Sequence, residues 1–428
     1  MNPVPPLDAQ EVTPRVFRAA VLTAELVERH GVSLDHAAST VFSKMRLRPG
    51  ERGTGYRLAW STLVGFAPAD LVLEEGGYRG LPARRRNAFR VAYVLRRRHG
   101  LSLGKISSVR GGLLGNRLLA LLGSRMLERV ETGIASMPHN LRLAYTYTVP
   151  PLITKTLVDK LGERRAEEVS RAYAWRRVWV RPLNPSEPGR LEDRLDRLGV
   201  RYRRDRDVGF LYEIFVKPWE ALPGVRGAVY QDKASVLAAS ALTRVVEGAP
   251  LLDVAAAPLL KTGILCTRGA EVVAADVSER RLRGGLRLAS HCRRLHVLAS
   301  DSTLPPLRSR FAGALLDAPC TNSGALGRNP GLRLSLWRLT EREVAEFSRL
   351  QALLLHNTLS LLRKGGVTVY STCSVLPAEG ERVVERVDAR PVPLDLPGEC
   401  GYDGLCIYRR LFPDRGTTGF FIAALARP

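Results

Sequence analysis

The chain has 428 residues, enough for two or three domains with a sizeable core, and its net charge of +23 comes from 65 basic against 42 acidic residues. It has no apolar run near the roughly 20 residues of a membrane span, and its six cysteines include no Cys-x-x-Cys pair, which argues against a transmembrane protein, a disulfide scaffold and a structural zinc site. We therefore expect a cytoplasmic protein with reduced thiols and no metal. The Arg excess favours nucleic acid as its partner, although a biased genome or a hot habitat would also enrich Arg.

The first part of the chain predicts a helical domain. Residues 1–14 are Pro-rich and lack the basic and apolar regions of a signal peptide, so we expect a short disordered lead-in. From residue 15 to 138 apolar side chains recur at helical spacing, and Ser33 is placed to cap a helix. Two arginine triplets bracket an apolar stretch and are candidate phosphate contacts, although a solvated helix face explains either triplet alone: Arg84, Arg85, Arg86, Arg96, Arg97 and Arg98.

Residues 139–225 predict a small mixed domain after a Pro-rich break. Residues 152–161 and 166–173 have helical patterns, and Val178 begins a β-rich run. An amphipathic helix over residues 191–198, ended by Gly199, and a strand over residues 211–216 complete a strand–helix–strand unit. Arg203 and Arg204 belong to a basic run that suits RNA, or equally a solvated strand or loop.

From residue 226 to 428 short apolar strands alternate with helices, which predicts a doubly wound, mainly parallel sheet. The strands are expected at residues 251–254, 272–275, 297–299, 314–316, 367–370 and 419–425. The first three end at or near Asp253, Asp276 and Asp301. An acid at the second strand tip binds ribose hydroxyls in dinucleotide and adenosyl sites alike, but the chain has no Gly-x-Gly-x-x-Gly, which disfavours a dinucleotide.

Two later strands each deliver a cysteine to their carboxyl end. One is followed by Asp317-Ala318-Pro319-Cys320 and the other ends in Ser371-Thr372-Cys373-Ser374. A single cysteine there is usually inert core. Two in matching contexts, each followed by a polar loop, predict instead that both thiols and Asp317 converge in a crevice.

These residues carry a family resemblance. Asp-Ala-Pro-Cys with Ser323-Gly324 and Arg328-Asn329-Pro330, and Tyr-Ser-Thr-Cys-Ser with Glu379 and Glu381, resemble motifs IV and VI of the RNA (cytosine-5) methyltransferases of the Sun (RsmB) type. Residues 252–262 resemble the motif I of that family, and the Arg content suits an archaeal or thermophilic member.

The resemblance implies a domain order. It predicts an α/β Rossmann-like S-adenosylmethionine-dependent methyltransferase domain over residues 226–428. A small α+β RNA-recognition-like domain over residues 139–225 and an all-helical NusB-like RNA-binding domain over residues 15–138 would precede it, after the lead-in. Arg181-Pro182-Leu183-Asn184 is similar to the Arg-x-Asn of the family's RNA-recognition-like segment.

The resemblance also implies site roles. Cys373 would add to carbon 6 of cytosine, Asp317 would bond the ring, Cys320 would assist release of the product, and Lys261 would favour the thiolate or hold the cofactor carboxylate. Leu259 and Leu260 replace two glycines of the family, so we expect weaker cofactor binding. The residues expected to hold S-adenosylmethionine are Ala255, Ala256, Ala257, Pro258, Leu259, Leu260, Lys261, Asp276, Arg281, Asp301 and Asp317. Arg328 joins the arginines expected to bind RNA.

Alternatives remain open. The expected partner is RNA, with ribosomal RNA favoured over transfer RNA, and the expected state is a monomer without membrane attachment. Leu259 and Leu260 are the support for a ribosome-assembly factor on a degenerate methyltransferase scaffold. A DNA cytosine methyltransferase would place its nucleophile at Cys320, and the Thr-Cys-Ser at Cys373 speaks against it.

Overall fold

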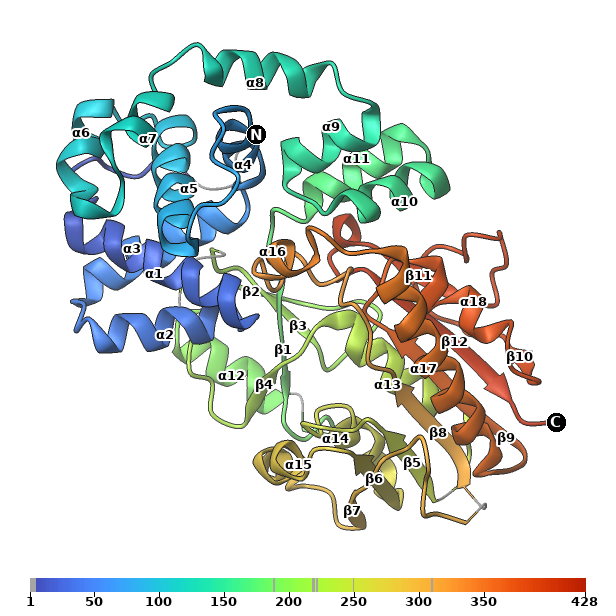
Figure 1. The fold of residues 1–428 in the computed structure, drawn as a ribbon. Coiled ribbons are helices and arrows are strands. Elements are labelled where there is room, and N and C mark those ends of the chain that lie inside the picture. The colour runs from blue at the N-terminus through green and yellow to red at the C-terminus, as the bar shows by residue number, and fades with distance from the viewer. Residues whose placement is uncertain (1–4, 188, 218–219, 221, 249, 309–310) are drawn as a thin grey trace. The chain divides into compact units, whose positions relative to one another are not determined.

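The computed structural model describes residues 5–428 apart from residues 188, 218–219, 221, 249 and 309–310 (Figure 1). Two compact units emerge. The helical unit comprises Met1–Arg176, Pro218–Glu220 and Leu326–Leu339. The sheet unit comprises Arg177–Lys217, Ala221–Ala325 and Thr340–Pro428.

The helical unit confirms the helical domain predicted for the first part of the chain. Its helices begin at local caps: Thr13 accepts a hydrogen bond from the Val16 amide, and Ser33, as predicted, accepts one from the His36 amide. The helices are α1 (Pro14–His30), α2 (Leu34–Lys44), α3 (Pro49–Leu63), α4 (Ala67–Glu75), α5 (Ala83–Arg97), α6 (Leu103–Val109), α7 (Asn116–Leu121), α8 (Met126–Ala135), α9 (His139–Tyr147), α10 (Pro151–Leu161), α11 (Glu163–Ala172) and α16 (Leu332–Leu336).

The expected disordered lead-in is wrong for the described residues before α1. Leu7 and Val12 are buried in the helical core, and the Leu7 amide donates to Nδ1 of His99 at 3.1 Å. Burial lowers the pKa of His99 to about 4, so the ring is neutral at pH 7 and its nitrogen can accept this bond. Residues 1–4 lie outside the described part of the chain.

A small antiparallel sheet opens the sheet unit. Its strands are β1 (Val178–Pro182), β2 (Tyr202–Arg204), β3 (Tyr212–Ile214) and β4 (Ala228–Tyr230), in the order β2-β3-β1-β4. Helix α12 (Gly189–Arg197) packs Leu191 and Leu195 into the apolar cluster of this sheet. The predicted strand–helix–strand unit is confirmed, with two further strands.

A second sheet carries the rest of the unit, in the order β10-β12-β9-β8-β5-β6-β7 with β11 beside β12. Strands β7, β6, β5, β8 and β9 pair in parallel, and β12 runs antiparallel to β9. The strands are β5 (Leu251–Val254), β6 (Val272–Asp276), β7 (Leu295–Ala299), β8 (Phe311–Asp317), β9 (Leu362–Thr372), β10 (Arg390–Val392), β11 (Arg409–Leu411) and β12 (Phe420–Ala426). The helices are α13 (Lys233–Val245), α14 (Thr262–Leu265), α15 (Glu279–Gly285), α17 (Glu341–Ser360) and α18 (Glu381–Val384).

Alternation along the strands buries both faces of the second sheet. Leu251 and Leu315 point to the cluster that contains α13, whereas Leu252 and Leu316 point to the cluster that contains α17. Parallel strands covered on both faces are the doubly wound arrangement predicted from the sequence. The chain winds outward from β5 through β6 and β7, then returns to β8 on the other side, so the switch point lies between β5 and β8.

Two predicted domain boundaries are wrong. Helices α9, α10 and α11, expected in the small mixed domain, group with the helical unit, and β4 lies beyond the boundary expected at residue 225. A Pro-rich break in sequence does not show which core the following helices join. No helix in the described part of the chain has both the length and the apolar character needed to cross a membrane.

Candidate active site

The carboxyl ends of β8 and β9 bring the two predicted cysteines together. The strands pair with Asp317 opposite Ser371, so the loops that follow leave the sheet at the same edge. The Sγ atoms of Cys320 and Cys373 lie 3.1 Å apart. The predicted convergence of both thiols with Asp317 is therefore confirmed as geometry.

The two thiols differ in environment. Cys320 is buried, and its hydrogen bond with Cys373, together with burial, raises its pKa well above the ordinary value. Cys320 is therefore the thiol that keeps its proton, and it can donate that proton toward Sγ of Cys373. Cys373 is half-buried, and its Sγ also lies 2.9 Å from Oδ1 of Asn322, a residue that was not predicted to belong to the site.

Glu379 holds the two cysteine loops together. Its fully buried carboxylate accepts hydrogen bonds from the amide and hydroxyl of Thr321, at 2.9 and 2.6 Å, and from the hydroxyl of Ser374, at 2.6 Å. Thr321 follows Cys320 and Ser374 follows Cys373. A backbone bond from Gly324 to the carbonyl of Cys373, 3.0 Å, adds to this clamp.

Glu381 forms a second buried acidic contact beneath the same loops. Arg410 donates from Nε to Glu381 at 2.8 Å, and its guanidinium lies 4.0 Å from the ring centroid of Tyr402. Another nitrogen of Arg410 reaches the carbonyl of Ser374 at 3.4 Å. The pair at Glu379 and Glu381 thus supports the two cysteine loops.

Lys261 lies at this edge but is engaged with Asp317. Its Nζ makes an ion pair with one oxygen of Asp317, and the hydroxyl of Ser371 donates to the other at 2.9 Å. In the described residues the thiol contacts come from Cys320 and Asn322. Lys261 thus lies against Asp317, and the expectation that it favours the thiolate remains a prediction.

The loop over residues 255–261 connects β5 to α14 at the switch point. Ala257 is held at both polar groups: its amide donates to Asp276 at 3.0 Å, and its carbonyl accepts from Arg281 at 2.7 Å. Gly285 of α15 comes so close that a Cβ there would lie 2.2 Å from the carbonyl oxygen of Pro258. Arg281, predicted to bind the cofactor, acts here as a support of the loop.

Leu259 adopts a backbone conformation that glycine favours, although glycine is absent at this position. Its φ of 71° lies in the left-handed region, which favours glycine. Its side chain is fully buried in a cluster with Ala274, Leu282 and Ala289. The leucine therefore fills the interior between β6 and the helices after it and does not project from the loop. The weaker cofactor binding expected from the missing glycines remains a prediction.

Asp276 and Asp301 follow neighbouring parallel strands. Asp276 is buried at the end of β6 and accepts from the amide of Ser278 at 2.8 Å in addition to that of Ala257. Asp301 is exposed, and hydrogen bonds from the amide and hydroxyl of Thr303 lower the pKa of its carboxyl. Both acids lie at the same edge of the sheet as the loop over residues 255–261, which follows β5.

Comparison with known proteins agrees with this geometry. Residues 240–426 match the model of the family described as 16S rRNA methyltransferase RsmB/F. Residues 240–426 are therefore similar to the methyltransferase domain of that family. The ribosomal RNA small subunit methyltransferase B of Thermus thermophilus is 37% identical over 206 residues, which cover 46% of this chain and 49% of that protein. The chain spans about half the length of the curated relatives that it matches.

Two solved structures share the architecture. A methyltransferase homolog protein from Pyrococcus horikoshii aligns with 68% of this chain and all of its own, at 26% identity and a TM-score of 0.57. The crystal structure of PH0851 covers 97% of this chain and 99% of its own, at 23% identity and a TM-score of 0.79, and shows that the fold extends beyond the methyltransferase domain.

Most arginines predicted to bind RNA have partners within their own unit. On α5 and at its C-cap, three make ion pairs with carboxylates and two donate to backbone carbonyls: Arg84 with Glu25, Arg86 with Glu28, Arg97 with Glu131, Arg96 with Leu101 and Arg98 with Val64. In the small sheet, Arg203 pairs with Glu213 and Arg204 donates to Gly209. Arg85 and Arg328 are exposed. The two triplets are therefore largely structural, and RNA contact by these arginines remains a prediction.

The expectation of reduced thiols is wrong for four of the six cysteines. Cys266 pairs with Cys292, and Cys400 pairs with Cys406, while Cys320 and Cys373 are free. The Cα atoms of the first pair lie 5.3 Å apart across a separation of 26 residues. Spacing in sequence could not show this proximity, because the fold of β6 and α15 creates it.

Asp253 at the end of β5 predicts a pH-dependent stability. Burial raises its pKa from 3.8 to about 7, and its Oδ1 has no hydrogen-bond partner in the described residues. Between pH 3.8 and about pH 7 the folded state therefore holds a proton on Asp253 that the unfolded state has lost. The free energy of unfolding should therefore fall as pH rises, by up to about 1.4 kcal/mol per pH unit. Asp253→Asn removes this loss, so thermal unfolding should show the variant gaining on the wild type from pH 4.5 to pH 8.

The control is Asp193→Asn, a change at an exposed side chain of α12. It should leave the difference from the wild type nearly constant with pH. An equally constant difference for Asp253→Asn would contradict the raised pKa.

The left-handed backbone of Leu259 alone would lead one to expect that a glycine there stabilises the fold, but the buried side chain predicts the opposite. Replacing leucine with glycine relieves about 1–2 kcal/mol of left-handed strain but removes buried packing of about 2–5 kcal/mol. Leu259→Gly should therefore lower the free energy of unfolding by about 1–3 kcal/mol in urea titrations. Leu260→Gly, at a partly exposed position, should lower it by less. A stabilised Leu259→Gly variant would show that strain outweighs packing.

Proposed function

We propose that this protein transfers a methyl group from S-adenosylmethionine to carbon 5 of cytosine in RNA, with Cys373 as the nucleophile. The observation that carries the proposal is the pair of free thiols 3.1 Å apart beside Asp317. The match of residues 240–426 to an RNA methyltransferase family supports it. Ribosomal RNA is the substrate we favour, because the matching relative from Thermus thermophilus is named for it.

The thiol pair can divide the chemistry between its members. Carbon 5 of cytosine is a weak nucleophile until a thiolate adds to carbon 6. Sγ of Cys373 forms that bond. Asp317, held by Ser371 and Lys261, accepts a hydrogen bond from the exocyclic amine, and its acid form can donate to the ring nitrogen, where negative charge develops. Carbon 5 then takes the methyl group that the cofactor supplies.

Cys320 suits the final step. Its raised pKa depends first on the hydrogen bond to Cys373. Once Sγ of Cys373 is bonded to carbon 6 it no longer carries a thiolate charge, so Cys320 gives up its proton more readily. After the Cys320 thiol has released its proton to solvent, its thiolate can take the proton from carbon 5. The electrons of that bond re-form the double bond between carbons 5 and 6, Sγ of Cys373 leaves as a thiolate, and the methylated base is released.

The residues around the switch point suit the cofactor. Ala255 and Leu259 both adopt left-handed backbone, at φ of 56° and 71°, so the loop follows a glycine-like course without the glycines. Because the Leu259 side chain is buried away from the loop surface, it removes the main support for a degenerate scaffold. The loop would hold the methionine end, Asp276 the ribose and Asp301 the adenine edge.

The remainder of the chain would bind the RNA. We assign a NusB-like role to α1–α8 and an RNA-recognition-like role to the small sheet, with Arg85 and Arg328 as exposed cations available to phosphate. The net charge of +23 gives long-range attraction to RNA, and extraction of the target base from its stack would be offset by such phosphate contacts. We propose that the protein acts as a cytoplasmic monomer.

The two cysteines predict opposite outcomes when each is replaced. Cys373→Ala should abolish methyl transfer to RNA, because no thiolate remains to add to carbon 6. Cys320→Ala should accumulate a covalent protein–RNA adduct through Cys373, because addition continues while release fails. Denaturing gels with radiolabelled RNA and S-adenosylmethionine measure both.

Asp193→Asn is the control, since its side chain is exposed on α12 of the small sheet. It should retain transfer and show no adduct. Full activity in Cys373→Ala would refute the assignment of the nucleophile. Sequencing of 5-methylcytosine in ribosomal and transfer RNA, with and without the protein, decides between the two substrates.

A further inference from the structure

Arg181 is a buried arginine with an unusual set of partners. It lies on β1 of the small sheet with no exposed surface, and burial lowers its pKa to about 10. Its guanidinium donates to Oε1 of Gln231 at 2.7 Å and to the carbonyls of Pro182 and Leu183 at 2.9 and 3.2 Å. Its remaining bond runs to the carbonyl of Leu260 at 2.7 Å. All these acceptors are neutral.

A buried guanidinium without a carboxylate partner is destabilising unless its donors are satisfied. Four neutral acceptors around the fixed fork of an arginine achieve this, and a lysine ammonium cannot reproduce that geometry. The position therefore accommodates a buried charge only as an arginine. Its contact with Leu260 indicates what the arginine contributes.

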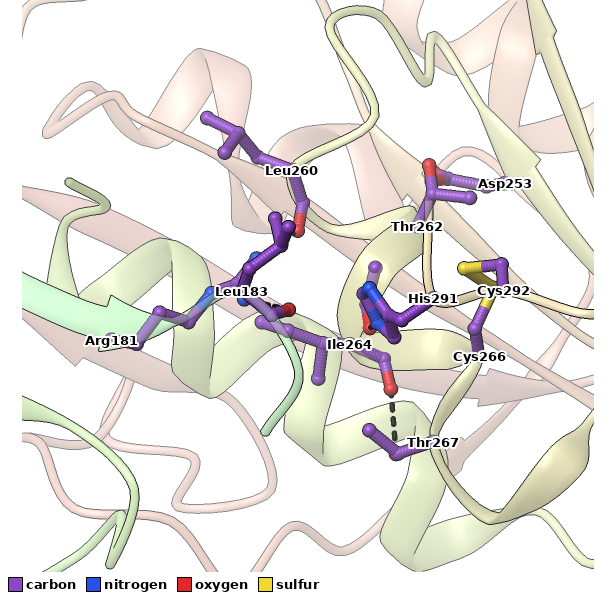
Figure 2. The surroundings of a disulfide bond; sticks show 11 residues. Arg181, Leu183, Asp253, Leu260, Thr262, Ile264, Cys266, Thr267, His291 and Cys292 are labelled. Carbon is purple, nitrogen blue, oxygen red and sulfur yellow. Dashed lines mark hydrogen bonds between the residues drawn. A yellow bond between two sulfur atoms is a disulfide. The ribbon is translucent and has the colours of Figure 1, made fainter. Parts of the chain in front are cut away.

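Leu260 belongs to the loop over residues 255–261, and Figure 2 shows Arg181 and the groups around the start of α14. Thr262 donates its hydroxyl to Asp253, and Nε2 of His291 lies 2.7 Å from the carbonyl of Gly263. A Cβ at Gly263 would lie 3.2 Å from His291 and 3.7 Å from Arg181, so both side chains lie close to Gly263.

The side chains that hold the loop over residues 255–261 and the start of α14 come from two different sheets. Asp253, Asp276 and Arg281 all come from the large sheet and the helix after β6, whereas Arg181 comes from β1 of the small sheet. Residues 79 positions apart in sequence are joined by the bond from Arg181 to Leu260. The small sheet therefore contributes directly to the shape of the loop, a contribution that RNA binding by that sheet would not require.

We propose that Arg181 is a positioning residue that sets the affinity for S-adenosylmethionine by fixing the Leu260 carbonyl and, through it, the loop over residues 255–261. This inference rests on the proposed function, because it takes that loop as the cofactor site. Gln231 orients Arg181 in turn, since its own amide is fixed by the hydroxyl of Ser235 at 3.0 Å. The small sheet thereby completes the cofactor site.

The test is calorimetric binding of S-adenosylmethionine to the full chain with Arg181→Gln, Arg181→Lys and Gln231→Leu. Loss of a hydrogen bond from a charged group predicts an increase in Kd of about 10- to 100-fold for Arg181→Gln. Arg181→Lys should show a smaller increase, because it keeps the charge but not the fork. Gln231→Leu, which leaves Arg181 in place but frees its Nε, should also weaken binding by less than Arg181→Gln.

Steady-state kinetics separate positioning from a general loss of structure. KM for S-adenosylmethionine should rise with Kd, while kcat at saturating cofactor and RNA affinity without cofactor stay within about threefold. The matched control is Arg197→Met, an exposed arginine of α12 that donates to a carbonyl of its own helix. It should leave Kd unchanged. If Arg181→Gln fails to fold, Arg181→Lys and Gln231→Leu carry the test.

Three results would overturn the inference. Folded Arg181 variants with wild-type Kd would show that the loop does not depend on Arg181, while the proposed function would stand. A fall in kcat with unchanged KM would move Arg181 from cofactor binding to the reaction step. A wild type that binds no S-adenosylmethionine, even with RNA present, would instead refute the proposed function and this inference with it.

Discussion

The parallel pairing of β8 with β9 is the constraint on which the site depends. It sets Asp317 opposite Ser371, so that two loops far apart in sequence leave the sheet side by side. Glu379 then fixes the loops to each other through Thr321 and Ser374. A shift of one residue in this register would turn alternate side chains to the other face and separate the thiols. The 3.1 Å between the two Sγ atoms follows from this pairing and this clamp.

The large sheet was predictable because its strands are short apolar runs with turn signals, and burial on both faces leaves few other interpretations for such runs. The predicted strand at residues 251–254 has the bounds of β5. Strands such as β10 and β2 were missed because each has only three residues and a largely exposed pattern. The grouping of α9–α11 with the helical unit depends on tertiary contacts, which local periodicity does not encode.

The site was predictable where a residue follows a strand and not where a partner comes from elsewhere. Asp317, Cys320 and Cys373 were predicted to converge from strand ends alone. The contact of Asn322 with Cys373 and that of Arg181 with Leu260 were not, since each depends on how a loop turns after its strand. The arginine triplets show the same limit in reverse, because acidic partners from other helices engage side chains that the sequence presents as free cations.

Peptide mapping of a trapped adduct tests the central claim most directly. RNA that carries 5-fluorocytosine places fluorine where the carbon 5 proton must leave, so an enzyme that adds a thiolate to carbon 6 stays bound after methyl transfer. With S-adenosylmethionine present, mass spectrometry of the digested complex should find the nucleotide on the peptide that contains Cys373. A nucleotide on Cys320, or no covalent complex despite bound cofactor, would contradict the account.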